Sequence, residues 1–531
     1  MELLGLLRNP LLGVLLIPMA LAADNFCLKN CLQSANVPSF FQGQAQFANL
    51  SSPYNVRLLF TPAAVVTAET AEDVSGAVKC ASSCGGFKVD NAASPCSSSM
   101  RNSRLQVQAR SGGNSYASHS IGGQNGSIVI DLSSMNQVKV NQDTTAEVGA
   151  GVRLGNLDKA LFDQGKRAIS HGTCANVGFG GQSLHGGYGF ESRLWGLALD
   201  HIQSLEVVLA NGTVAEASPT KNEDLFWAVR GAGESFGVVT KFNIRTEAAP
   251  DSLVYWTFDL SDILKDISTA VGALEHIQDF ALNKSIQDRR LSWGWLLDDQ
   301  TFLLRGKFHG PMDEFNQRIA PEMLRGLPDL AGDDRDVREV GWLSSQALYA
   351  HGSDDISKLA QPSRPGEYSK HENFYAKSLT SPDPLSKEAI TAYVRYAVNE
   401  GAKVKSPSSW YSIANLYGGP DSHIGVYNSS WSAYGNRDSL WVFQNHATVD
   451  LGEPFDTSLP EFLSGLNDAV TRSMPNTRFG AYANYIDPGL SAEDAHRLYY
   501  GELYPRLLDI KKRVDPDQTF SNPLAVGVGD F

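Results

Sequence analysis

The chain has 531 residues, of which 42% are hydrophobic and 19% charged, and its formal net charge is −14. This length exceeds the usual size of one hydrophobic core, so two domains are predicted. The negative charge repels nucleic acid and anionic membranes and argues against both as partners. We expect a monomer that acts on a small molecule.

The first 22 residues are typical of a secretory signal peptide. Arg8 supplies a positive charge, Leu11 to Leu21 is apolar, and Ala20-Leu21-Ala22 matches a cleavage site. The apolar stretch is short for a membrane span, although a signal anchor is the alternative. Secretion is therefore predicted. Glycosylation sequons fit that route and begin at Asn49, Asn125, Asn211, Asn283 and Asn428.

Cysteines in an oxidising compartment predict disulfide bonds. Cys27 and Cys31 are four residues apart, as are Cys80 and Cys84, in segments with a helical pattern. Two antiparallel helices could pair Cys31 with Cys80 and Cys27 with Cys84. A bond between Cys84 and Cys96 is an equally open alternative.

Short apolar runs alternate with glycine-rich turns from Pro53 to about Thr246. This alternation, without a long pattern of parallel-strand crossovers, predicts an α+β domain. Strands are expected at 65–67, 105–109, 127–131, 146–148 and 205–209, and helices beginning at 71, 156 and 224.

The segment 250–470 has a different character and predicts one sheet covered by helices. Expected strands are 256–258, 292–295 and 302–305, and expected helices are 262–282, 312–325, 386–400 and 456–473. Charged, proline-containing segments at 326–337 and 360–371 predict loops. Beyond 476 we expect a strand at 479–485 and one long helix over 492–514.

Four glycine-rich turns are the segments that most clearly indicate a ligand-binding site. They read RSGGNSY at 110–116, GAG at 149–151, SHGTCANVGFGG at 170–181 and GGYG at 186–189. Glycine has no Cβ, so such turns bring backbone N–H groups close to a phosphate-bearing ligand. A plain β-turn is the ordinary interpretation of any one of them.

Together, these turns resemble the FAD-linked oxidases of the berberine-bridge-enzyme-like group, within the vanillyl-alcohol oxidase superfamily. The resemblance covers about residues 30 to 525, and the text at 371–379 is similar to secreted oligosaccharide oxidases of this group. It implies an α+β fold with a two-subdomain, PCMH-type FAD-binding domain at 23–248. A substrate domain at 249–475, an antiparallel sheet backed by helices, is then inserted before residues 476–531 return to the FAD domain.

The resemblance implies two attachment positions for FAD. The first is normally a histidine bonded to the 8α methyl of the flavin, and here it is Asn114, whose amide cannot form that bond. The second is a cysteine bonded to ring carbon C6, and Cys174 matches it. Attachment through Cys174 alone is therefore expected, with an ordinary structural cysteine as the alternative.

Further FAD contacts follow from the same resemblance. Val177 matches the position that governs oxygen access, where a small valine accompanies oxidase activity. A valine that only packs is the alternative. The remaining implied contacts are Ser111, Gly112, Gly113, Ser115, Gly178, Gly181, Gly187, Gly237 and Val239. No paired histidine or cysteine spacing predicts a metal site.

Polar residues near these turns are candidates for particular roles. His185 is a candidate group on the substrate side, and Asp200 is expected to cap a loop. Tyr485, within Ala-Asn-Tyr-Ile-Asp, resembles the tyrosine that takes the substrate's hydroxyl proton. With a pKa near 10, it needs a positive or hydrogen-bonding neighbour to act as a base. Tyr116 is expected to contact the same pocket.

The substrate-side sequence predicts a flatter, more apolar pocket than a sugar requires. Ser369 and Ile413 stand where the resembled enzymes have an acid and an amide, and Leu416 and Tyr417 add apolar surface. Trp410 and its neighbour Tyr411 are expected to belong to the core.

These residues predict a flavin oxidase acting on a small natural product, by alcohol oxidation or oxidative cyclisation. The expected chemistry transfers a hydride to flavin N5, with O2 as the final acceptor. A carbohydrate oxidase that forms lactone and H2O2 is the alternative. An FAD-free binding module, suggested by Asn114, is a third possibility.

Overall fold

The computed structural model describes residues 26–84, 87–88, 101–102, 105–367 and 370–531. The predicted signal peptide, Cys96 and Ser369 lie outside these residues. Two hydrophobic cores organise the described chain: one is built from residues 28–244 with parts of 417–526, and the other from 254–470. The predicted α+β fold class is confirmed, while the exact domain boundaries stay a prediction.

Two sheets form the N-terminal half. In the smaller, β2 and β5 both run parallel to β6, a short parallel element that the sequence did not predict. Its strands are β1 (Ser39–Phe40), β2 (Ala64–Thr67), β6 (Ile128–Asp131) and β5 (Val107–Arg110). The larger is antiparallel and consists of β11 (Val214–Ala217), β10 (Ile202–Val208), β12 (Val238–Arg245), β8 (Thr145–Gly149) and β7 (Val138–Val140). Short two-stranded pairs add β13 (Glu247–Ala248) with β9 (Arg167–Ala168), and β3 (Phe87–Lys88) with β4 (Arg101–Asn102).

One of the helices of this half, α3, begins at a side-chain cap. Before α3, the Thr70 hydroxyl accepts the Asp73 N–H and the Asp73 carboxylate accepts the Thr70 N–H, which forms a capping box. The helices are α2 (Phe47–Leu50), α3 (Ala71–Ser83), α4 (Leu154–Asp163), α5 (Phe179–Ser183), α6 (Ser192–Trp195) and α7 (Glu223–Ala232).

Two disulfide bonds connect the start of the described chain to α3. Cys27 bonds Cys84 and Cys31 bonds Cys80, with Cα atoms 5.6 and 5.7 Å apart. This is the pairing expected of two antiparallel helices, and it excludes the alternative bond between Cys84 and Cys96.

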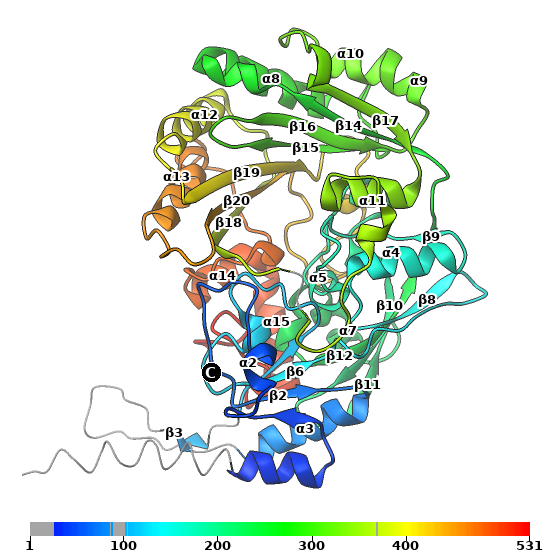
Figure 1. Ribbon diagram of the computed structural model, residues 1–531, viewed down its shortest axis with the longest axis vertical. Coiled ribbons are helices and arrows are strands. Elements are labelled where there is room, and N and C mark those ends of the chain that lie inside the picture. Colours follow the sequence, from blue (N-terminus) through cyan, green and yellow to red (C-terminus); the bar gives the residue numbers. More distant parts are fainter. Residues whose placement is uncertain (1–25, 85–86, 89–100, 103–104, 368–369) are drawn as a thin grey trace, which may run out of the picture.

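A seven-stranded antiparallel sheet dominates the second half (Figure 1). Its order is β17 (Arg335–Val340), β14 (Leu253–Asp259), β16 (Phe302–Phe308), β15 (Leu291–Leu297), β19 (Ser408–Leu416), β20 (Trp441–Val449) and β18 (Asn373–Ser381). Helices α8 (Ile267–Leu282), α12 (Lys387–Gly401) and α13 (Leu459–Thr471) cover its outer face, and α9 (Met312–Glu314), α10 (Ala320–Met323) and α11 (Trp342–His351) lie beside β14, β16 and β17.

Three local predictions were wrong. Residues 335–340, expected in a loop, form the edge strand β17, whose charged side chains suit a strand with one neighbour. The strand expected at 479–485 is instead an irregular segment ending in a 3-10 turn, Ala483–Tyr485. The helix expected over 492–514 is divided into α14 (Ala492–Tyr499) and α15 (Tyr504–Val514), because Gly501 adopts a positive φ and Pro505 starts a new helix.

A buried ion pair joins the two halves. The Lys307 ammonium on β16 lies 2.7 Å from the Glu191 carboxylate just before α6, and both side chains are almost fully buried. Burial is the largest single influence on Glu191 and raises its pKa, but the charge and hydrogen bond of Lys307, together with the nearby His309 and His171, hold that pKa below its usual value. The sheet of the second half is thereby fixed against the glycine-rich loops of the first.

We predict that Lys307→Met destabilises the protein by about 3–5 kcal/mol, because Glu191 keeps its buried charge without a partner. Because the folded pKa of Glu191 is lowered, the wild-type stabilisation is complete above the ordinary glutamate range. It is lost as pH falls through the lowered pKa. The free energy of unfolding, measured with denaturant, should be compared for the wild type, Lys307→Met and the double variant that also carries Glu191→Gln. A single variant as stable as the wild type would contradict the prediction.

Candidate functional site

A cavity of about 540 Å³ lies between the glycine-rich loops and the seven-stranded sheet. Most of the implied FAD-contacting residues line it: Ser111, Gly112, Gly113, Asn114, Ser115, Cys174, Val177, Gly178 and Gly181. Gly187, Gly237 and Val239 are not among its lining residues, and their role stays a prediction. Gly187 instead donates its N–H to the Tyr482 hydroxyl, and Val239 pairs with Val207 inside the five-stranded sheet.

Backbone contact between two loops shapes the floor of the cavity. A Cβ on Gly178 would lie 2.1 Å from the Gly112 nitrogen, and one on Gly112 would lie 2.2 Å from the Gly178 nitrogen. No residue except glycine allows this approach without backbone movement. The Ser111 hydroxyl adds a hydrogen bond of 2.6 Å to the Ala150 carbonyl, so three of the four glycine-rich turns meet here.

Asn114 bridges the same two loops through its side chain. With the amide oriented to satisfy both groups, it donates to the carbonyls of Asn176 (3.1 Å) and Gly112 (3.0 Å). In return its oxygen accepts the Asn176 amide N–H at 3.1 Å. Asn114 therefore holds the first loop against the loop that carries Cys174.

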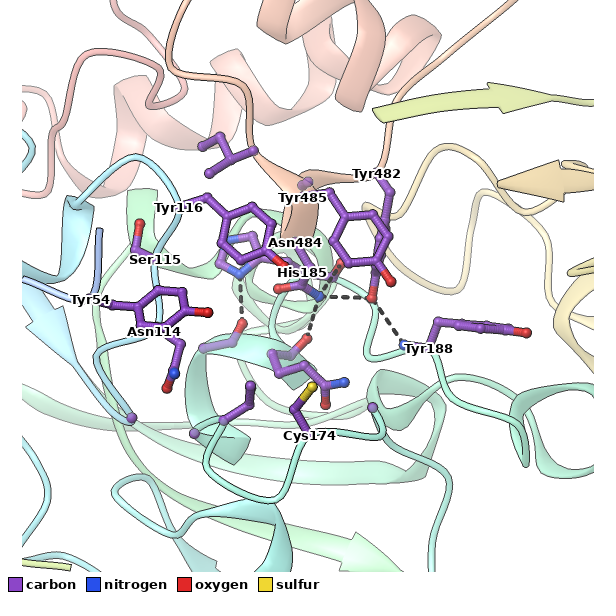
Figure 2. Close-up of a pocket in the computed structure, with 18 of the residues that line it drawn as sticks. Tyr54, Asn114, Ser115, Tyr116, Cys174, His185, Tyr188, Tyr482, Asn484 and Tyr485 are labelled. Atoms are coloured by element: carbon purple, nitrogen blue, oxygen red, sulfur yellow. Dashed lines mark hydrogen bonds between the residues drawn. The ribbon is translucent and has the colours of Figure 1, made fainter. Parts of the chain in front are cut away.

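Cys174 directs its thiol into the cavity, across from the rings of Tyr116 and Tyr485 (Figure 2). Among the described cysteines it is the one outside a disulfide. Burial raises the pKa of this thiol, and a hydrogen bond with Thr173 partly offsets the effect. The accessible side chain and its position opposite two aromatic rings suit attachment to a flat ring system.

Tyr485 belongs to an aromatic cluster on the far side of the cavity (Figure 2). Its ring stacks on Tyr116 at 6.2 Å and meets Tyr482 edge to face at 4.9 Å. The Tyr116 hydroxyl accepts a 2.8 Å hydrogen bond from Gln444 on β20. Burial raises the pKa of Tyr485 well above its ordinary value, so the described chain does not supply the pKa-lowering neighbour that the sequence analysis required.

The wall formed by the seven-stranded sheet is more polar than the sequence predicted. Its lining side chains are Leu296 on β15, Arg305 on β16, Tyr411, Ile413 and Asn415 on β19, and Gln444 and His446 on β20. Leu416 and Tyr417 do not line the cavity and lie in the cores, which corrects the expectation of an apolar pocket. Trp410 is buried as expected, whereas Tyr411 faces the cavity and stacks on His446 at 4.8 Å.

A carboxylate is also present in this wall. Glu372 accepts a 2.8 Å hydrogen bond from the Tyr54 hydroxyl and pairs with Lys370. Although burial opposes ionisation, these two partners and His446 keep the pKa of Glu372 below its usual value. The loss of an acidic group inferred at Ser369, which lies outside the described residues, therefore leaves the cavity with a carboxylate from another position.

The histidines and Asp200 have defined partners. His185 lines the cavity, contacts the Glu234 carboxylate and hydrogen bonds the Gly181 carbonyl at 2.7 Å. His171 is buried outside it, where Asp158 at 2.9 Å raises its pKa against the opposing effect of burial. Asp200 caps the Leu197 N–H, as expected, and also pairs with Arg437 at 2.7 Å.

Sequence reasoning missed several wall residues: Tyr54, Arg305, Glu372, Gln444 and His446. The available signal was alternation, since 411, 413 and 415 on β19, and 444 and 446 on β20, point to one face of the sheet. These strands are flanked on both sides and rich in apolar residues, which hides a two-residue period. No cluster suited to a metal ion occurs among the residues that the structure describes.

The geometry fits FAD. The close approach of two glycine loops exposes backbone to a ligand, and Cys174 is accessible within the cavity. Two buried oxygens at the cavity, Gln182 Oε1 and the Tyr188 hydroxyl, have no hydrogen-bond partner in the described chain, which is costly unless a ligand supplies one. These features define an FAD-dependent oxidoreductase.

Comparison with known proteins supports this class. Residues 95–218 match an FAD binding domain, and residues 481–527 match the family described as berberine and berberine like. The chain is 35% identical to a xylooligosaccharide oxidase from Thermothelomyces thermophilus, over 95% of each chain. It belongs to the berberine-bridge-enzyme-like family of FAD-linked oxidoreductases.

Solved structures extend the likeness. A xylooligosaccharide oxidase from Myceliophthora thermophila C1, in complex with xylobiose, superposes with a TM-score of 0.83 at 34% identity. That match covers 94% of this chain and 99% of the other. A glucooligosaccharide oxidase from Acremonium strictum, described with a 6-S-cysteinyl, 8α-N1-histidyl FAD, gives 0.83 at 31% identity over 94% and 99%. In this chain, the cavity contains the thiol of Cys174, and Asn114, which is not a histidine, cannot form a histidyl link.

Proposed function

We propose that this protein is a secreted FAD-dependent oxidase that acts on oligosaccharides and passes electrons to O2. The main support for this proposal is the full-length similarity to oligosaccharide oxidases, together with a cavity wall rich in groups that can bind hydroxyls. Arg305, Asn415 and Gln444 offer hydrogen bonds to a sugar on the side opposite the flavin loops. Two disulfides and the signal-like N-terminus support secretion.

This proposal replaces the expected preference for an apolar natural product. That expectation depended on Ser369 and Ile413 in place of polar groups, and on Leu416 and Tyr417 as apolar surface. Ser369 lies outside the described residues, and of the other three only Ile413 lines the cavity. Tyr411 presents a ring and a hydroxyl beside it, an arrangement that suits a sugar ring as well as a flat apolar molecule. The relatives named above favour the carbohydrate substrate.

Residues of the glycine loops are proposed to hold FAD. The backbone of 111–115 and the turn around Gly178 would bind its diphosphate, and Cys174 would form the single covalent link. When bound, FAD would accept a hydride from the substrate, and O2 would then reoxidise the flavin with formation of H2O2. Val177, which lines the cavity three residues beyond Cys174, is proposed to leave room for O2.

Tyr485 is proposed as the group that accepts the proton of the substrate hydroxyl. Its ring faces the cavity from a 3-10 turn and stacks on Tyr116, which Gln444 fixes in place. As the O–H proton leaves to Tyr485, the adjacent carbon loses a hydride, so the alcohol becomes a carbonyl. From a sugar hemiacetal the product is a lactone.

The proposed function predicts H2O2 formation from xylo-, cello- or chito-oligosaccharides. Purified holoprotein should release peroxide from at least one series in air, with matched consumption of O2. Simple apolar alcohols serve as the comparison panel. Peroxide from the alcohols but from none of the sugars would reject the carbohydrate assignment.

Single attachment through Cys174 predicts a specific behaviour on denaturation. Wild-type protein precipitated in acid should keep its yellow colour, whereas Cys174→Ala should release FAD to the supernatant. Asn114→Ala is the matched control, because it removes the amide bridge but no covalent bond. Complete loss of flavin from the wild type would show that the link is absent.

The role of Tyr485 predicts a loss of about 10²–10⁴-fold in kcat for Tyr485→Phe, the usual contribution of a general base. Because burial raises the pKa of Tyr485, the reactive phenolate becomes more populated as pH rises. Wild-type kcat/KM should therefore increase from neutral to alkaline pH, and the Phe variant should lose this dependence. Flavin content, read by absorbance, should not change. A fully active Tyr485→Phe would exclude the proposed role.

A further inference from the structure

Two cations on strand β16 differ in their partners. Lys307 pairs with Glu191 at 2.7 Å and contacts Gln346 at 3.2 Å. Arg305, two residues earlier and on the same sheet face, lines the cavity. Its guanidinium forms no hydrogen bond or ion pair with any residue in the described part of the chain. The fold neutralises one of these charges internally and leaves the other available to a ligand.

The neighbours of Arg305 across the sheet carry no charge. On β16 it lies opposite Gly294 of β15 and Thr257 of β14, and Gly294 contributes no side chain. Other residues of the surrounding wall are Leu296, Tyr349, Tyr411 and Ile413. None of these carries a negative charge at neutral pH, so they cannot compensate the guanidinium.

The remaining ionisable groups of this wall do not compensate it either. Lys370 and Glu372 neutralise each other. His446 is uncharged at neutral pH, because burial lowers its pKa to about 4. One positive charge thus remains at the substrate side of a protein whose net charge is −14. A partly buried, unpaired charge is unfavourable, and a ligand anion would relieve that cost.

Arg305 also lies near the reacting end of the cavity. Its charge acts on the Cys174 thiol and the Tyr411 hydroxyl, lowering the pKa of each against the stronger effect of burial. An anion bound at Arg305 would therefore lie close to the bond that is oxidised. It would belong to the oxidised sugar or to its immediate neighbour.

We propose that Arg305 binds a substrate carboxylate and that the preferred substrates are acidic oligosaccharides containing a uronic acid. This inference rests on the proposed carbohydrate oxidase function and specifies its substrate class. A guanidinium presents a planar fork of N–H donors that matches a carboxylate in two parallel hydrogen bonds. A neutral sugar offers only hydroxyl groups, which leave the charge uncompensated.

The test compares neutral disaccharides with acids that differ from them only by one or two carboxylates. Cellobiose and cellobiouronic acid differ only at C6 of the non-reducing sugar, and galactobiose and digalacturonic acid differ at C6 of both. Wild-type kcat/KM should be at least tenfold higher for one acid than for its neutral partner. Arg305→Gln should remove this preference, mainly by raising KM for the acid at least tenfold more than KM for its neutral partner.

Two further variants separate charge from structure. Arg305→Lys keeps the charge without the fork and should retain part of the preference. Arg472→Gln removes an exposed arginine that pairs with Asp468 on the surface, and should behave as wild type. Equal kcat/KM for both members of each pair in the wild type would overturn the proposal. So would an equal loss for acid and neutral sugar in Arg305→Gln.

Failure of the proposed function has a different signature. If no sugar, neutral or acidic, yields peroxide, the carbohydrate assignment fails. The role of Arg305 is then tested by measuring whether an acidic sugar binds. Digalacturonate should then still perturb the flavin absorbance of wild-type holoprotein, and Arg305→Gln should abolish the perturbation. Absence of binding to the wild type, or unchanged binding to the variant, would reject the carboxylate site itself.

Discussion

The hydroxyl of Tyr482 is the point on which the arrangement of the site depends. It accepts the N–H groups of Gly187 and Tyr188, each at 3.0 Å, and a third hydrogen bond from Asn484 at 2.9 Å. The Tyr482 N–H in turn donates to Ser378 on β18 at 2.9 Å. One residue thus connects a glycine-rich turn, the C-terminal segment and the seven-stranded sheet, and these buried bonds leave little freedom between them.

This connection explains why the C-terminal segment approaches the site as an irregular turn. The Asn484 side-chain amide also donates to the carbonyls of Gln182 and His185, which fixes this turn against the loop that follows Cys174. Tyr485 is carried to the cavity as a result. The two disulfides act far from this point, at α3, and stabilise the edge of the N-terminal half without shaping the cavity.

Local residue patterns and sequence motifs predicted those parts of the structure that depend on residues close together in the sequence. The strand before α3, the start of that helix and the glycine-rich loop carrying Cys174 followed from such signals. The turn at 479–485 could not be predicted, because its alternating apolar residues satisfy contacts with distant segments. The polar wall was missed for a related reason. Glu372 and Arg305 are far apart in the sequence, and only the folded structure brings β16 and the segment before β18 to the same cavity.

Contacts within the protein itself hold together the two glycine-rich loops that carry Asn114 and Cys174. Gly112 and Gly178 touch through their backbones, and the amides of Asn114 and Asn176 hold the same two loops together. A side chain without an amide at position 114 would give up this pair. Preorganisation of the two loops reduces the entropy that binding of a ligand must overcome, and the second of these loops carries Cys174 into the cavity.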